Sequence, residues 1–259
     1  MDTPTTTRIS AKYRLFLPYW AVFQTDLRQT MRNWVYMTWV IAVSLTAFGY
    51  VLYRMGAHRE TGWVQQAADV MNDLLRWVVL GSVAMIAALA VGSISAERGT
   101  LADSVLSRGI SRYQYFLAKF HSRLVCVLGT IMFLGMLMLT GCYAMLSEEK
   151  LSLAGGLMAL VVVAALLMVV VSCGVTLSAL CGNTLLGMSL LWLFLYGGGY
   201  MLELLPASIP TPDRVLHEMP AILRGTYDSQ LIWRLLEGTA ILSFAAALFG
   251  MVGFSRRDV

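Results

Sequence analysis

Charged residues are scarce in this sequence, and that scarcity excludes a water-soluble fold. Only 13% of the 259 residues are Asp, Glu, Lys or Arg, while 58% are hydrophobic and the mean hydropathy is +0.69. A soluble domain carries about 25% charged residues. Several charge-free runs reach the roughly 20 residues that a helix needs to cross a bilayer. The composition therefore predicts an all-α, polytopic membrane protein.

Motifs for catalysis and nucleotide binding are also missing. There is no G-x-x-x-x-G-K-[S/T] sequence, so the chain has no phosphate-cradling loop of its own. There is no H-E-x-x-H or G-x-S-x-G motif, and the three histidines (His58, His121 and His217) do not have metal-ligand spacing. We therefore expect no enzyme activity, metal or cofactor in this chain, and no binding to nucleic acid.

Ionisable residues and cysteines are rare in the apolar runs. A proton- or ion-driven carrier needs ionisable groups at membrane depth, so their near absence argues against secondary transport. Four cysteines lie in or at the ends of apolar runs without a C-x-x-C pair; they are Cys126, Cys142, Cys173 and Cys181. They are predicted to be small apolar packing residues.

Six apolar runs are predicted to be membrane spans, at residues 34–53, 74–95, 124–146, 152–180, 185–205 and 238–254. The fourth and fifth belong to one uncharged stretch, 151–202, which would extend about 78 Å as a single helix. Because the hydrocarbon core is about 30 Å thick, this stretch must fold back. Residues 181–184, Cys-Gly-Asn-Thr, are its turn-like interruption. The spans form one domain, residues 34–259.

Residues 1–33 are predicted to be a polar tail followed by a helix in the membrane interface. Between Lys12 and Arg32 apolar residues recur at helical spacing among basic ones, and Pro18 breaks the helix near its start. A basic amphipathic helix that carries Trp and Tyr is typical of the bilayer surface; the alternative is a simple juxtamembrane end of the first span. The segment lacks the early apolar core and cleavage site of a secretory signal.

Three further stretches of the sequence give structural predictions. Within residues 54–73 an apolar stripe at helical spacing predicts another surface helix, and its members are Trp63, Ala67, Val70, Met71 and Leu74. The Pro-rich stretch 206–237 is predicted to be a large loop in which residues 222–233 touch the membrane surface. The glycine triplet 197–199 predicts either close packing against another helix, which we favour, or a hinge.

The distribution of charge predicts the orientation. Six spans place both termini on one side of the membrane, together with residues 96–123. That side carries 12 of the 19 Lys and Arg residues but only 5 of the 15 acidic residues. The positive-inside rule places it in the cytoplasm. We expect a multi-pass protein of the cell inner (cytoplasmic) membrane with both termini cytoplasmic and the 206–237 loop outside.

A polar, basic segment between the second and third spans contains two helix starts. Thr100 with Asp103 fits a capping box, and Ser111 with Gln114 fits another. Gly109 lies between them, where a helix commonly ends. We predict a short helix over residues 101–108, a sharp stop, and a second helix that runs from residue 112 into the membrane. A short helix held outside the bilayer by two spans is well shaped to dock on another protein.

This segment resembles the cytoplasmic loop of the permease subunits of type-2 ABC exporters. That loop often reads E-x-G-T-L…L-S-x-P-I-S-R…K, and the matching residues here are Glu97, Arg98, Gly99, Thr100, Leu101, Leu106, Ser107, Arg108, Ile110, Ser111, Arg112 and Lys119. Gly109 stands where the family usually has proline, and glycine can also break the chain. The six-span layout, the basic helix before the first span and the ending at residues 254–258 are similar as well.

The resemblance implies a division of labour between chains. Two permease subunits, expected to form a homodimer in the lipid bilayer, would each dock on one of two copies of a separate ATPase subunit that holds ATP and Mg²⁺. The implied docking residues are Glu97, Arg98, Gly99, Thr100, Leu101, Asp103, Val105, Leu106, Ser107, Arg108 and Arg112. The first, second and fifth spans would face the export path.

Two other functions remain open from the sequence. The same architecture could pass ATPase-driven motion to an extracytoplasmic partner protein through the 206–237 loop, without transporting a substrate. An intramembrane enzyme is the third hypothesis, and the lack of paired catalytic groups at membrane depth argues against it. The substrate is not identified by the sequence.

Overall fold

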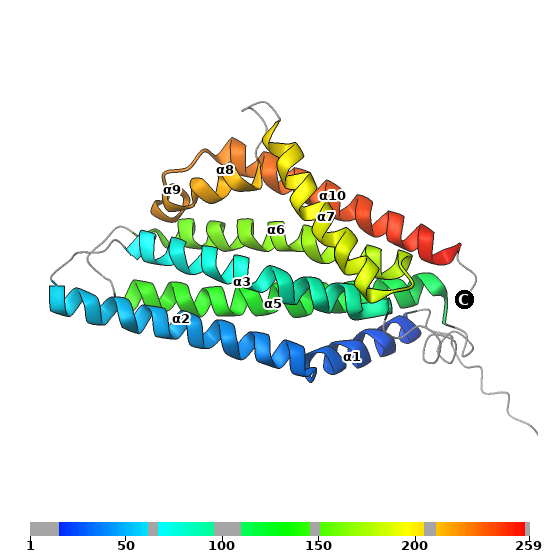
Figure 1. Cartoon of the computed structure of the whole chain (residues 1–259). Helices are drawn as coiled ribbons and strands as arrows, with labels where there is room; N and C mark the ends of the chain where they lie inside the picture. The colour runs from blue at the N-terminus through cyan, green and yellow to red at the C-terminus, as the bar shows by residue number, and fades with distance from the viewer. Residues whose placement is uncertain (1–15, 62–66, 96–109, 146–150, 205–210, 257–259) are drawn as a thin grey trace, which may run out of the picture.

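The structure is a computed structural model that describes residues 16–61, 67–95, 110–145, 151–204 and 211–256 (Figure 1). The regular elements in these ranges are helices: α1 Leu17–Met31, α2 Trp34–Thr61, α3 Ala67–Ser95, α5 Arg112–Met145, α6 Leu153–Leu180, α7 Thr184–Glu203, α8 Pro212–His217, α9 Met219–Arg224 and α10 Ser229–Ser255. Six of them, α2, α3, α5, α6, α7 and α10, are long and apolar enough to cross a membrane. The predicted all-α, six-span membrane fold is confirmed.

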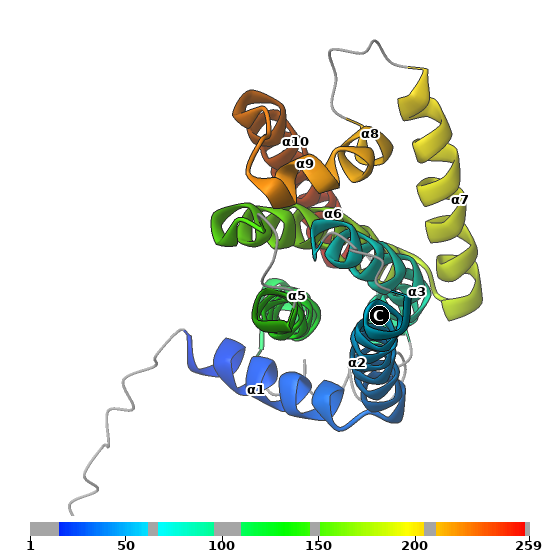
Figure 2. The ribbon, with the colours of Figure 1, turned by 90° about the vertical axis from the view of Figure 1, so that its left-hand side faces the viewer.

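Helix α6 is the centre of the bundle. It packs against α3 and α5 on one side and against α9 and α10 on the other, and it also contacts α7. Figure 2, a view along the bundle, shows α6 between these groups and α7 standing apart at one side. Helix α1 lies across the end of the bundle at which α10 finishes, and we call this the α1 end. The opposite end, where α8 and α9 lie, is called the α9 end.

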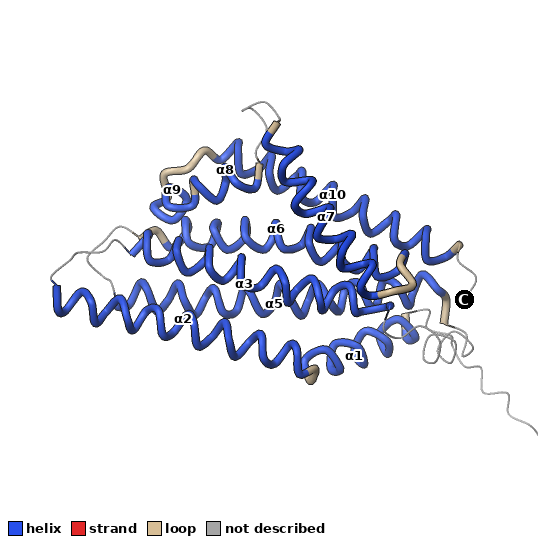
Figure 3. The backbone as a smooth tube through the Cα atoms, in the orientation of Figure 1, coloured by secondary structure: helices blue, strands red, loops and turns tan. Residues whose placement is uncertain are grey.

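The fold-back between the fourth and fifth spans is where the sequence predicts it. Helix α6 ends at Leu180 and α7 begins at Thr184. Asn183 caps α7, because its side-chain oxygen accepts a hydrogen bond of 2.9 Å from the backbone N–H of Leu185. Helices α2, α3 and α10 are longer than the predicted spans at their polar ends, and Figure 3 shows them as continuous tubes. Helix α10 already begins at Ser229, because helices continue beyond the apolar core of the membrane, whereas α5 begins at Arg112 as the second helix start predicts.

The prediction of a separate surface helix within residues 54–73 is wrong. Residues up to Thr61 continue α2, and α3 begins at Ala67. The described members of the apolar stripe, Ala67, Val70, Met71 and Leu74, are all buried in the core on α3, whereas Trp63 lies outside the described residues. The periodicity was real, but it marks the inward face of a spanning helix.

The stretch 206–237 is more structured than a loop. Helices α8 and α9 pack on the bundle, and the backbone N–H of Ser152 donates a hydrogen bond of 3.1 Å to the carbonyl oxygen of Leu223. Ile222 is buried among the helices, and residues from Ser229 onward belong to α10. The expectation that residues 222–233 touch the membrane surface is therefore wrong for Ile222, whereas Trp233 is exposed on α10. Gly225 ends α9 with φ +79°, a left-handed conformation that suits glycine.

The glycine triplet neither packs nor breaks its helix. Helix α7 runs without interruption through residues 197–199. A Cβ atom added at any of the three would meet no atom within 4 Å in the described part of the chain. The predicted close packing is therefore not found within this chain, and the flanking Tyr196 and Tyr200 are exposed.

Gly155 tests the docking of α9 on α6. A Cβ atom at this position would lie against the carbonyl oxygen of Ile222 and 2.9 Å from that of Leu223. These are backbone atoms, so we expect Gly155→Ala to lower the free energy of unfolding by about 1–3 kcal/mol. Gly198→Ala is the matched control, expected to be neutral or to stabilise by up to about 1 kcal/mol. Denaturant unfolding of both variants in detergent, followed by circular dichroism, measures the difference; equal effects would contradict the packing.

Candidate functional site

The structure describes the helix ends on either side of the predicted docking segment, and we call these two helix ends its attachments. Its residues from Glu97 to Arg108 lie outside the described residues, and only Arg112 of the predicted set is described. Ser95, the last residue of α3, precedes the segment, and Arg112, the first residue of α5, follows it. Both attachments lie at the α1 end (Figure 1).

The attachment on α3 is tied to the turn between α6 and α7. The buried hydroxyl of Ser178 on α6 accepts hydrogen bonds of 2.9 Å from the backbone N–H groups of Ile94 and Ser95. The hydroxyl of Ser95 also lies 2.9 Å from that of Thr184, the first residue of α7. The last turn of α3 is therefore held by two neighbouring helices.

The attachment on α5 begins with the capping box that the sequence predicts. The Ser111 hydroxyl accepts a hydrogen bond of 3.2 Å from the backbone N–H of Gln114, and the Gln114 side chain accepts one of 3.3 Å from the backbone N–H of Ser111. Arg112 donates a hydrogen bond of 3.3 Å to the carbonyl oxygen of Ser255 on α10. Tyr115 stacks on Phe254 with ring centroids 6.1 Å apart. The start of α5 is thus joined to the end of α10.

One turn further along α5, a group of buried polar side chains joins this helix to α1. We call it the α1–α5 charge cluster, and its members are Asp26, Thr30, Lys119, Ser122 and Arg123. Lys119 donates a hydrogen bond of 2.6 Å to the carboxylate of Asp26, and Arg123 lies 3.5 Å from the same oxygen. Ser122 donates to the other carboxylate oxygen. Arg123 also donates a hydrogen bond of 2.6 Å to the hydroxyl of Thr30.

Helical spacing brings these residues together. Asp26 and Thr30 are four residues apart on α1, and Lys119, Ser122 and Arg123 follow the same spacing of three and four on α5. Only 2% of the surface of Asp26 and 3% of that of Lys119 is exposed. A buried carboxylate needs charged and hydrogen-bonding partners, and here it has two hydrogen-bond donors, Lys119 and Ser122, and a second cation in Arg123. The cluster carries two cations for one anion, so its net charge is positive.

A second contact reinforces the same interface. The hydroxyl of Tyr19 on α1 lies 2.9 Å from Nδ1 of His121 on α5. Burial raises the pKa of Tyr19 above its ordinary value. Together with the charge cluster, this contact determines the rotation of α1 about its axis.

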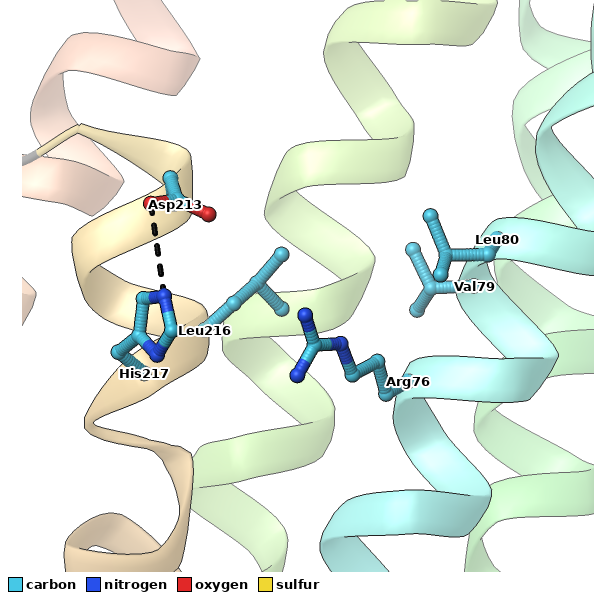
Figure 4. A pocket seen from close by; sticks show the side chains of 6 residues that line it. All are labelled: Arg76, Val79, Leu80, Asp213, Leu216 and His217. Carbon is cyan, nitrogen blue, oxygen red and sulfur yellow. Dashed lines mark ion pairs between the residues drawn. The ribbon is translucent and has the colours of Figure 1, made fainter. Parts of the chain in front are cut away.

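A small recess at the α9 end is lined by polar and apolar residues of α3 and α8 (Figure 4). Arg76, Val79 and Leu80 of α3 face Asp213, Leu216 and His217 of α8 across about 110 Å³. His217 and Asp213 lie 3.6 Å apart. Pockets for small-molecule ligands measure about 300–1,000 Å³, so this recess is too small to hold a transported molecule.

Cysteines and candidate metal ligands are distributed as follows. All four cysteines are buried and free, which confirms that they are packing residues. Among the described residues, no group of three or more His, Cys, Asp or Glu side chains could hold a metal ion.

The charge cluster was missed by sequence reasoning. Lys119 was selected only through the resemblance, and Asp26 not at all. The sequence indicates this cluster only through one carboxylate, Asp26, on an otherwise basic amphipathic helix, with Thr30 four residues after it. That pattern does not say which helix supplies the partners, because the cations lie 93 and 97 residues away in the chain.

Asp26→Asn tests the cluster as the link between α1 and α5. The substitution leaves Lys119 and Arg123 buried beside a neutral side chain, so we expect a loss of about 3–5 kcal/mol of folding free energy. Asp26→Asn/Lys119→Met removes the pair together and is expected to recover part of that loss. The matched control is Asp73→Asn at the more exposed Arg54–Asp73 pair, 3.2 Å apart, where the loss should stay below about 1 kcal/mol. Denaturant unfolding in detergent measures all three; equal losses at Asp26 and Asp73 would contradict the assignment.

Comparison with known protein families and with curated proteins found no match for this chain. The resemblance to exporter permeases therefore depends on the loop motif and the six-span layout alone. What the structure establishes is a multi-pass helical membrane protein whose central polar segment is attached to several helices at the α1 end.

Proposed function

We propose that this chain is the transmembrane permease subunit of an ATP-driven exporter of the type-2 ABC kind. Hydrolysis of ATP takes place on a separate ATPase subunit, present in two copies, which holds ATP and Mg²⁺. The observation that carries the proposal is the pair of attachments of residues 96–109. Each is hydrogen-bonded to helices other than its own, as a segment that receives force requires.

The attachments suggest how a push on the docking segment spreads through the protein. On the α3 side it passes through Ser95 to Ser178 and Thr184, and so to α6 and α7. On the α5 side it passes through Arg112 to α10 and through Lys119 and Asp26 to α1. Closure of the ATPase dimer would therefore tilt most of the bundle as packed units, and α5 would move together with α1.

A second permease subunit is part of the proposal. The resemblance assigns the export path to the first, second and fifth spans, which are α2, α3 and α7. Two of these are poorly covered in the single chain, because only 28% of the α2 span and 11% of the α7 span is buried. Those faces are available to the second subunit and to lipid.

The proposed location is the cell inner membrane, with the α1 end in the cytoplasm. The basic start of α5 and the helix α1, with its basic residues, belong to this end. In this orientation α8 and α9 lie on the extracytoplasmic side, and the docking segment faces the compartment that supplies ATP.

A mechanical coupler is the second candidate, and the docking of α9 favours it. Arg224 at the end of α9 lies 3.2 Å from Asp69 on α3, and the backbone bond between Ser152 and Leu223 ties α9 to α6. Motion of α3 and α6 would thus reach residues 206–237 directly. An extracytoplasmic partner protein bound there could receive it without any substrate moving.

Acidic substitutions in the docking segment test the proposed function. We expect Leu101→Asp, Leu106→Asp or Arg108→Asp to abolish copurification of a Walker-A-bearing ATPase and the ATP hydrolysis of the purified complex, because the substitutions place a carboxylate in the docking contact. The matched control is Arg234→Asp, which changes an exposed arginine on α10 at the far end of the bundle. An ATPase that remains bound to all three docking variants would refute the proposal.

Reconstituted vesicles separate the exporter from the coupler. An exporter is expected to move an amphiphilic probe, for example a fluorescent phospholipid, in an ATP-dependent way that the Arg108→Asp variant lacks. A coupler is expected to hydrolyse ATP without moving the probe, and its ATP turnover should change when Arg224→Glu breaks the ion pair with Asp69. Restoration by Asp69→Arg/Arg224→Glu would show that the pair itself is responsible.

A further inference from the structure

Helix α1 has three different faces. The face toward α5 contains Asp26 and Thr30 and is buried. A second face is apolar and exposed, with Leu17, Trp20 and Met31. The third is polar and exposed, and its residues are Thr25, Arg28, Gln29 and Arg32, spaced three and four apart. An amphipathic helix on a membrane needs only two faces, so the polar third face calls for an explanation.

The polar face cannot turn toward the protein. The charge cluster and the contact between Tyr19 and His121 hold the opposite side of the helix on α5. Thr25, Arg28, Gln29, Arg32 and Asn33 line an open recess of about 490 Å³. Neither Arg28 nor Arg32 makes an ion pair within the described part of the chain. Two guanidinium groups one helical turn apart thus face a recess with no carboxylate among its lining residues.

The recess adjoins the first residue of a candidate membrane span. Helix α2 begins at Trp34, which is also the first residue of a candidate membrane span. Arg32 and Asn33 immediately precede that point, and Arg28 is one turn earlier. Trp20 and Trp34 are exposed on either side, as expected for aromatic residues at a membrane–water interface.

The chemistry of the recess matches a phosphate group with acyl chains attached. Guanidinium groups bind phosphate oxygens bidentately, and the side-chain amides of Gln29 and Asn33 add further donors. The adjacent apolar face of α1 can cover acyl chains. The net positive charge of the nearby cluster strengthens attraction to an anion. We propose that Arg28 and Arg32, with the amides of Gln29 and Asn33, form a binding site for the phosphate of an anionic phospholipid. This site does not depend on the proposed function.

Native mass spectrometry of the purified full chain tests the site. The protein is titrated in detergent with phosphatidylglycerol and, separately, with phosphatidylcholine. We expect retention of phosphatidylglycerol to weaken at least about tenfold in Arg28→Gln/Arg32→Gln, because each arginine near an anionic surface contributes a several-fold factor. The matched control Arg76→Gln/Arg234→Gln removes two exposed arginines at the α9 end and should retain the lipid. Inorganic phosphate at millimolar concentration should not displace it.

Several outcomes would overturn the site. Equal retention of the two lipids, or unchanged retention in Arg28→Gln/Arg32→Gln, would remove the headgroup assignment. Displacement by inorganic phosphate would show a free-anion site instead. If Arg28→Gln/Arg32→Gln binds lipid as wild type does but loses a copurifying ATPase, the polar face of α1 binds a protein partner instead. Because both side chains are exposed, the thermal midpoint of unfolding should not change in Arg28→Gln/Arg32→Gln. If it does change, the variant Arg28→Lys/Arg32→Lys tests the site instead. Its lipid retention is expected to lie between that of wild type and that of the glutamine variant.

Discussion

The position of α1 depends on one ionic interaction, the contact of the Asp26 carboxylate with Lys119 and Arg123. All three groups are largely withdrawn from water, so each has lost solvation that only the partners replace. A carboxylate in this environment tolerates no shift of α1 that would separate it from its donors. The same contact sets which side of α1 faces outward. The recess lined by Arg28 and Arg32 and the rigid link between α1 and α5 both follow from it.

The α1 end differs from the α9 end in the kind of contact that holds it together. At the α1 end, hydrogen bonds and charges connect the ends of α3, α5, α6, α7 and α10 around the docking segment. At the α9 end, backbone packing of α9 on α6 and an ion pair to α3 hold the short helices in place. Helix α7 has few contacts along its second half, where its glycines meet no neighbour in the described chain. A force applied to the docking segment would therefore act on a well-connected bundle in which one span, α7, has few contacts.

Some local features of the fold could be read from the sequence. The turn at residues 181–184 and the capping box of Ser111 and Gln114 were predicted correctly, because both depend on residues within four positions of each other. The apolar stripe of residues 67–74 was detected but given the wrong role. Helical periodicity identifies a buried face without saying whether a membrane surface or another helix covers it. The first, second and sixth spans were predicted too short, since hydropathy ends where the membrane ends and the helix does not.

Composition and local spacing determined the class of this protein: its six spans, its all-helical fold and its internal turns. These properties follow from the free energy of placing apolar side chains in a bilayer and from hydrogen bonds between near neighbours in the chain. The tertiary structure alone decided that Asp26 meets Lys119 and Arg123, that α9 rests on Gly155, and that Arg28 and Arg32 face outward. Contacts between helices depend on rotation and tilt, which a single sequence does not encode in any local pattern.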